Sequence, residues 1–162
     1  MQRTTERHTF FFRPESPFSQ WHPARFVVDG LEFSCAEQFM MHGKAILFGD
    51  AAIAAEILAV ASPRQHKALG RKVSGFDDRA WKAHREEIVL AGSRAKFSQN
   101  PDLLSVLLAT HGTQLVEASP FDRIWGVGLS MSDPRIDDPA NWRGQNLLGK
   151  ILTRLRDELR AA

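Results

Sequence analysis

Two ionisable residues seven positions apart, Glu37 and Lys44, are the first candidates for chemistry in this sequence. In an α-helix a spacing of seven is close to two turns, so both side chains would project from one face, with a rise of about 10 Å between them. Long side chains can converge across that gap on one ligand. The same residues also have a purely structural interpretation, in which Glu37 forms a capping box with Ser34 and Lys44 is a solvated charge.

A second group of residues combines a tryptophan with closely spaced glycines. Asp122 and Arg123 precede Trp125, which is followed by Gly126 and Gly128. Glycines allow a ligand to approach the backbone closely, and an indole ring can stack on a base. The alternative is a buried structural tryptophan beside a turn.

A third group, the segment WRGQNLLGK at residues 142–150, joins a turn to the last expected helix. It places Asn146 in the first turn of that helix, where backbone N–H groups can attract a phosphate, or where Asn146 could simply cap the helix. Basic side chains near these groups could contact phosphates or could be ordinary surface charges. They are Arg13, Lys67, Arg71 and Lys96.

Local patterns predict the elements that must position these residues. The run Phe10–Phe12 predicts a buried strand over residues 8–13, and the Asp29-Gly30 pair predicts a type I′ hairpin over residues 25–33. Helical periodicity starts at Ser34 and ends near Gly49. Further helices are expected at residues 51–60, 65–69, 78–97, 101–110 and 148–159, with Asp50 and Asp77 as caps and a short strand at 115–116.

Composition bounds the class of protein. The chain has 162 residues with no repeat or linker, so we expect an α+β fold: one mainly helical domain over residues 1–162, with a core at about 10–159 and a small N-terminal hairpin or sheet. The single cysteine, Cys35, excludes an internal disulfide and is interpreted as a small core residue without a partner base. The six histidines are scattered, so no metal is expected. The standard dinucleotide-binding and phosphate-loop motifs are absent, so no cofactor is expected.

Charge and hydropathy limit the partners. The net charge of +2 is too balanced to indicate nucleic-acid binding by electrostatics alone. Apolar stretches fall short of the roughly 20 residues that a membrane span needs, and the first ten residues lack the apolar region of a signal peptide. We therefore expect a cytoplasmic protein without a membrane partner.

Taken in order, five segments resemble the NADAR family, also called YbiA-like proteins, from about Phe10 to Leu159. They are SCAEQFMMHGKAILFGD, LGRKVSGFD, AKFSQN, LVEASPFDRIWGVGL and WRGQNLLGKIL. The resemblance implies a compact, mainly helical fold and an N-glycosidase that cleaves the C1′–N bond of a glycosylamine.

The implied substrates are phosphoribosylaminopyrimidine intermediates of riboflavin synthesis, which we expect first, or guanine that carries ADP-ribose. In the second case, nucleic acid would be a partner only as a modified substrate. A third possibility is a catalytically silent module that binds NAD or ADP-ribose.

The glutamate and lysine of the family match Glu37 and Lys44, so these two residues are expected to be catalytic. Glu37 would handle the proton or the water and Lys44 the sugar carbon, either in direct hydrolysis or through a Schiff base. Trp125 would stack on the substrate, while Arg13 and Arg71 would bind phosphate. The complete set expected to bind substrate is Arg13, Phe18, Ser19, Trp21, Arg71, Asp122, Trp125, Gly126 and Asn146.

Two segments are expected to govern which substrate is bound. One is the loop at residues 14–23, and the other is SMSDPRIDDPAN at residues 130–141. If the second segment borders the pocket, its acids Asp133, Asp137 and Asp138 would repel a bulky phosphorylated polymer or bind a ribose hydroxyl.

Overall fold

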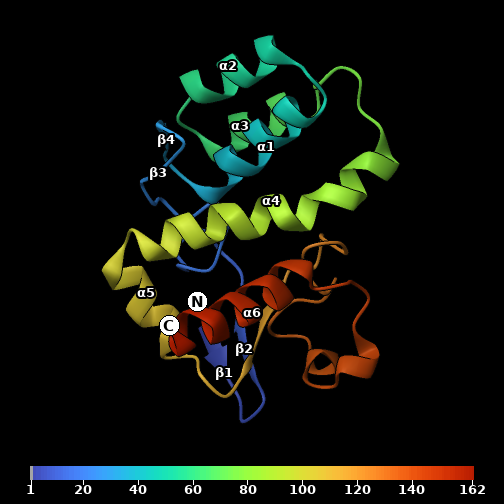
Figure 1. The fold of residues 1–162 in the computed structure, drawn as a ribbon. Coiled ribbons are helices and arrows are strands. Elements are labelled where there is room, and N and C mark those ends of the chain that lie inside the picture. The colour runs from blue at the N-terminus through green and yellow to red at the C-terminus, as the bar shows by residue number, and fades with distance from the viewer. Residues whose placement is uncertain (1) are drawn as a thin grey trace. The chain divides into compact units, whose positions relative to one another are not determined.

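The computed structural model of the protein describes residues 2–162, which form helices and two small sheets (Figure 1). This composition confirms the predicted α+β, mainly helical fold. The chain forms two compact units: one joins the segment that ends at His22 to Pro101–Ala162, and the other is Pro23–Asn100. The single domain over residues 1–162 stays a prediction. Within residues 2–162, no helix has the length and apolar character to cross a membrane.

A three-stranded sheet organises the first unit. Strand β1 (Gln2–Thr4) runs antiparallel to β2 (His8–Phe11), and β2 runs parallel to β5 (Gln114–Glu117). All four residues of β2 are buried, which confirms the buried strand predicted from the phenylalanine run, although the strand ends at Phe11 and not at residue 13. In the parallel pair Phe10 lies opposite Val116, so the pairing brings together segments that are far apart in the sequence.

Helix α6 (Leu147–Ala161) packs against β5, and a side chain of the helix and that of its N-cap residue bond to this strand. Thr153 Oγ1 accepts a hydrogen bond of 2.9 Å from the backbone N–H of Leu115. Asn146 Oδ1 accepts from the N–H of Glu117 at 3.0 Å, and its Nδ2 donates to the carbonyl of Leu115 at 3.1 Å. Asn146 stands at the N-cap position of α6 but makes no side-chain cap bond, so the capping alternative is wrong.

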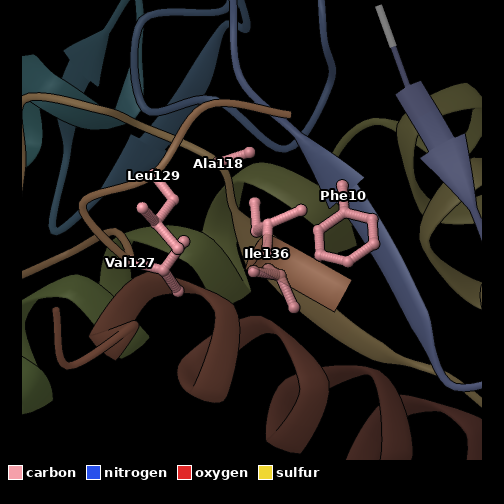
Figure 2. Packing of buried hydrophobic residues seen from close by; sticks show 6 residues of the cluster. Phe10, Ala118, Val127, Leu129 and Ile136 are labelled. Atoms are coloured by element: carbon pink, nitrogen blue, oxygen red, sulfur yellow. The ribbon is translucent and has the colours of Figure 1, made fainter. Parts of the chain in front are cut away.

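The core of the first unit lies between the sheet and the long loops that follow β5. Figure 2 shows this cluster, whose buried members are Phe10, Val116, Ala118, Val127, Leu129 and Ile136. The chain around it forms α5 (Pro101–Leu108) and two short 3₁₀ helices, η1 (Pro134–Asp137) and η2 (Pro139–Asn141). Trp142 packs on the cluster and donates from Nε1 to the carbonyl of Ile136 at 2.8 Å. The loop that carries Trp125 is therefore anchored in the core by its own Val127 and Leu129.

The second unit combines a hairpin with four helices. Strands β3 (Phe26–Val28) and β4 (Leu31–Phe33) are joined by Asp29 at φ 50° and Gly30 at φ 78°, which confirms the predicted type I′ turn. The helices are α1 (Ala36–Leu47), α2 (Ala51–Ala59), α3 (Pro63–Gly70) and α4 (Asp78–Ser98). Helix α1 is the centre of this unit, because it packs against each of the other three.

Helix starts in the second unit decide between two interpretations of Glu37. Asp50 and Asp77 cap α2 and α4 through their side chains, as predicted. The capping box predicted at the start of α1 is wrong: the N-cap is Cys35, and Ser34 donates to Gln38 Oε1 from its N–H at 2.7 Å and its hydroxyl at 3.1 Å. Gln38 thus occupies the role that the sequence pattern assigned to Glu37.

Replacing Asn146 by alanine should destabilise the protein by at least about 2 kcal/mol. The change leaves the part-buried N–H of Glu117 and the buried carbonyl of Leu115 without these partners, at about 1–3 kcal/mol for each unsatisfied group. Alanine also adopts the φ of 53° at this position less readily than asparagine. The measurement is the free energy of urea unfolding, and Asn141→Ala is the matched control because the Nδ2 of Asn141 bonds to Arg135 at the exposed surface. Equally small losses of unfolding free energy in both variants would contradict the conclusion that the bonds of Asn146 to β5 stabilise the protein.

Candidate functional site

Glu37 and Lys44 both belong to α1, as predicted, and their spacing places them on one face of that helix. The side chain of Glu37 is buried, with 5% of its surface exposed, and Lys44 is half-buried. A carboxylate and an amine that leave water together on one helix face cost free energy, which makes this pair unlike two solvated surface charges. The surface-charge interpretation of Lys44 therefore does not fit the structure.

Two aromatic rings surround the amine of Lys44. Its Nζ lies 4.7 Å from the ring centroid of Phe76 and 5.7 Å from that of Trp81, within the range in which a ring face attracts a cation. Phe76 follows Gly75, whose φ is +73°, and packs against Phe48 at the end of α1 with 5.4 Å between ring centroids. These contacts fix where the amine lies.

Phe76 is the residue near Lys44 that the sequence analysis missed. It lies in the loop between α3 and α4 and is 45% exposed, although it is a large apolar side chain. The only sequence signal for it is an aromatic residue placed between a glycine and a helix-capping aspartate. That pattern does not reveal which side chain it contacts.

The surroundings of Lys44 lower the pKa of its amine below the value of an exposed lysine. Burial lowers the pKa of the amine, the negative charge of Glu37 raises it, and the positive charge of Arg71 lowers it. Arg71 is exposed at the C-cap of α3. The charges of Glu37 and Arg71 therefore both act on Lys44 within the second unit.

Cys35 is buried at 2% exposure, which confirms that it is a core residue. The expectation that it has no partner base is wrong, because its Sγ lies 3.6 Å from Nδ1 of His66. His66 Nε2 lies 2.7 Å from the carbonyl of Val60, so Nε2 carries the proton and Nδ1 accepts from the thiol. Burial raises the pKa of Cys35 and lowers that of His66, so both stay neutral. Among the described residues, no three His, Cys, Asp or Glu side chains gather as a metal site.

The sequence allowed Lys96 to be either a phosphate contact or an ordinary surface charge. Its burial does not fit either interpretation. It is 1% exposed on α4, and its Nζ lies 4.9 Å from the ring centroid of Phe97. Burial lowers its pKa to about 7, against a small opposing effect of Cys35. Lys96 is thus a second amine of this unit whose protonation is set by desolvation.

In the first unit, the structure brings two predicted groups together. Backbone hydrogen bonds of 2.8–3.2 Å run from the N–H groups of residues 143 and 145–148 to the carbonyls of residues 123–127. A side chain on Gly144 would collide with the carbonyl of Gly126, so glycine is required at residue 144 for this close approach. The segments around Trp125 and Asn146 therefore form one rigid unit.

Asp122 and Asn146 have structural roles within that unit. One carboxylate oxygen of Asp122 accepts from the N–H groups of Ile124 at 2.8 Å and Trp125 at 2.9 Å, which shapes the loop. Asn146 is fully buried and both ends of its amide bond to β5. Trp125 itself is half-buried and Gly126 is buried.

The loop after β2 holds the remaining predicted residues. Consecutive turns run from Arg13 to His22, and Ser19 Oγ accepts from the N–H of Trp21 at 3.1 Å. Phe18 is 1% exposed and packs edge-on against Phe11, whereas Trp21 is half-buried and Arg13 is exposed. Their roles in binding stay predictions.

Comparisons with known proteins place the chain in a family. The NADAR domain model matches residues 8–160, so the chain belongs to the NADAR family, as its motifs predicted. It is 46% identical over 147 residues to an N-glycosidase of Acanthamoeba polyphaga mimivirus, covering 87% of this chain and 86% of the relative. It is 38% identical over 171 residues to protein irg-1 of Caenorhabditis elegans, covering 96% and 81%. The NMR structure of the Escherichia coli protein YbiA matches with a TM-score of 0.80 and 28% identity, over 98% of this chain and 88% of that one.

The pKa of Lys44 should be lower in the folded protein than in the same protein unfolded in urea. Competitive labelling with an amine-reactive anhydride over a range of pH, read by mass spectrometry, gives the midpoint in both states. Glu37→Gln should move the native midpoint down, because Glu37 raises the pKa, and Arg71→Gln should move it up, because Arg71 lowers it. Shifts of the same sign in both variants would contradict this electrostatic picture.

Lys96 should make the stability of the protein rise with pH above about 7. Below that pH, Lys96 is protonated in both the folded and the unfolded protein, and burying its charge costs free energy in full. Between about pH 7 and the unfolded pKa of about 10.4, Lys96 is protonated only in the unfolded protein, so raising the pH favours folding. The slope is then about 1.4 kcal/mol per pH unit. Urea unfolding at several pH values compares the protein with Lys96→Met, which lacks this dependence. A constant difference between the two proteins across pH would refute it.

Proposed function

We propose that this protein hydrolyses the C1′–N bond of phosphoribosylaminopyrimidine intermediates of riboflavin synthesis, in the cytoplasm. The chain is a hydrolase of N-glycosyl bonds, a class supported by the names of its relatives. The observation that carries the proposal is Lys44, a half-buried amine with a lowered pKa on the same helix face as the buried carboxylate of Glu37. A small phosphorylated substrate also fits the net charge of +2 better than a long nucleic-acid duplex does.

The linkage in the substrate suits an amine nucleophile. In a glycosylamine, C1′ is bonded to the exocyclic nitrogen of the base, so the sugar ring can open: the ring oxygen takes a proton and C1′ becomes an imine. Neutral Lys44 attacks C1′ through Nζ, and the base leaves as its amine with the proton. C1′ then remains as a Schiff base of Lys44, and no cofactor is needed.

Glu37 manages the protons of this sequence. A charged lysine cannot attack, so the proton of Lys44 passes to Glu37 or to the opening ring oxygen. In the second half, Glu37 takes a proton from water, the hydroxide adds to C1′, and the Lys44 amine leaves as the sugar aldehyde forms. The lowered pKa of Lys44 reduces the cost of the first transfer.

Residues outside α1 have proposed binding roles. Arg71, exposed beside Lys44, and Arg13, exposed in the first unit, would each hold a phosphate oxygen. Trp125 would stack on the base. The other residues proposed to contact or shape the bound substrate are Phe18, Ser19, Trp21, Asp122, Gly126 and Asn146.

Glu37→Gln and Lys44→Ala should each lower turnover of the aminopyrimidine ribotide by about 10²–10⁴-fold, the usual contribution of such groups. Borohydride should trap a sugar adduct on the wild-type protein but not on the Lys44→Ala variant. Glu56→Gln and Lys82→Ala, at exposed positions of α2 and α4, control for the substitutions themselves. Unchanged turnover in either site variant removes that residue from the mechanism, and turnover that depends on Lys44 without a trapped adduct favours direct hydrolysis.

Guanine that carries ADP-ribose on its exocyclic amine has the same C1′–N linkage, so it belongs in the same assay. Faster cleavage of an ADP-ribosylated guanine oligonucleotide than of the ribotide would replace the proposed substrate and keep the chemistry. Cleavage of neither would overturn the enzyme proposal in favour of a module that only binds NAD or ADP-ribose.

A further inference from the structure

A cavity of about 540 Å³ in the first unit lies among segments that are distant in the sequence. Its size is within the range of about 300–1,000 Å³ that small-molecule pockets occupy. The walls come from β1, from the end of β2, from the turn after β5 and from residues 130–132. The segment at 130–141, expected to govern substrate choice, therefore borders a cavity with its first three residues.

One side of this cavity is apolar. Phe12, Pro120 and Met131 line it, and Met131 also packs on the core cluster of the unit. Pro120 lies in a turn in which Ser119 Oγ accepts from the N–H of Asp122 at 3.1 Å, and this turn leads into the loop that carries Trp125. Inorganic phosphate has no apolar surface to bury against these residues, whereas a ligand with a ring would bury apolar surface there.

The other side offers positive charge and hydroxyl groups. Arg13 lines the cavity with an exposed guanidinium, and no carboxylate pairs with it in the described part of the chain. Ser130 and Ser132 place their hydroxyls 3.3 Å apart on the same wall. A guanidinium with nearby hydroxyl donors is a common arrangement for binding a phosphate group.

The acidic residues that follow do not cancel this charge. Asp137 is paired with Arg3 at 2.8 Å, and Asp133 is paired with Arg135, whose hydrogen bonds lower the pKa of Asp133 to about 2. Each of these carboxylates is therefore neutralised by an arginine of its own. The repulsion of phosphate that the sequence suggested is therefore offset for these two acids. The third acid, Asp138, accepts from the N–H of Ala140 and does not line the cavity, whereas Arg13 does.

We propose that this cavity binds an organic phosphate with a ring system, a nucleoside monophosphate or a larger molecule that contains one. The phosphate bonds to Arg13 and the serine hydroxyls, while the ring packs on Phe12, Pro120 and Met131. That this ligand is part of the substrate rests on the proposed function, and in that case Phe12, Pro120 and Met131 replace Trp125 as the surface on which the base packs. The binding itself does not depend on catalysis.

Binding is tested by calorimetry with Lys44→Ala protein, which cannot form the proposed Schiff base. The probes are AMP, ribose 5-phosphate, inorganic phosphate and adenosine. AMP should bind more tightly than ribose 5-phosphate or phosphate, which lack the ring, and more tightly than adenosine, which lacks the charge. Equal affinities for AMP and inorganic phosphate, or for AMP and adenosine, would overturn the proposal.

Variants locate the binding. Arg13→Gln should weaken AMP by about tenfold to a hundredfold, as expected when hydrogen bonds to a charged group are lost. Arg160→Gln, at the exposed end of α6, should leave the affinity unchanged. Met131→Ala should weaken AMP but not inorganic phosphate, with circular dichroism to verify folding. Undiminished AMP binding by folded Arg13→Gln protein would refute the assignment.

The two proposals fail in different ways. If AMP binding needs Arg13 but the wild type cleaves neither glycosylamine, the cavity stands and the proposed function falls. If the wild type cleaves the ribotide and Arg13→Gln changes neither AMP affinity nor KM, the proposed function stands and the cavity assignment falls.

Discussion

Desolvation of Lys44 is the constraint on which the arrangement around α1 depends. An amine that leaves water needs compensation, and no carboxylate stands at ion-pair distance from it in residues 2–162. The faces of Phe76 and Trp81 supply part of that compensation, and the more distant charge of Glu37 supplies another part. The compensation is incomplete, so the pKa falls. A fully paired lysine would be a good structural cation but a poor nucleophile.

The first unit holds a buried arginine and an exposed arginine in different ways. Arg156, 4% exposed on α6, donates to the carbonyls of Thr110 and Thr113 and pairs with Asp157. These contacts give the buried guanidinium hydrogen-bond acceptors and a carboxylate partner, so Arg156 has a structural role in holding α6 against residues 110–113. Where the chain leaves a cation without such partners, at Arg13, a cavity lies beside it. This contrast separates Arg156, a structural cation, from Arg13, a candidate for ligand binding.

Local patterns predicted much of the fold, because turns and caps involve residues a few positions apart. Asp29-Gly30, Asp50 and Asp77 act as their sequence neighbours indicated. The start of α1 differed because Gln38, one residue beyond the expected acid, reaches the same backbone N–H and also bonds to the carbonyl of Ile57 in α2. Tertiary contact thus decided between two neighbouring polar side chains.

Pairings between distant segments could not be predicted in this way. The parallel alignment of β2 with β5, the contact of Cys35 with His66 and the position of Phe76 beside Lys44 depend on chain reversals that no local pattern encodes. For the site, the spacing on one helix predicted that Glu37 and Lys44 share a face. It could not predict their burial, since burial comes from the helices and loops packed around α1.

The bonds between α6 and β5 also limit what the sheet can pair with. The N–H groups of Leu115 and Glu117 point away from β2 and would otherwise form an open strand edge, but Thr153 and Asn146 occupy them. An open edge invites a strand of another chain, the first step of β-aggregation and of strand exchange between copies. Here a helix closes that side with two side chains, and the opposite edge is β1, only three residues long. Asn146 therefore has a second effect: by occupying the N–H of Glu117 it helps to keep the edge of β5 from pairing with a strand of another molecule.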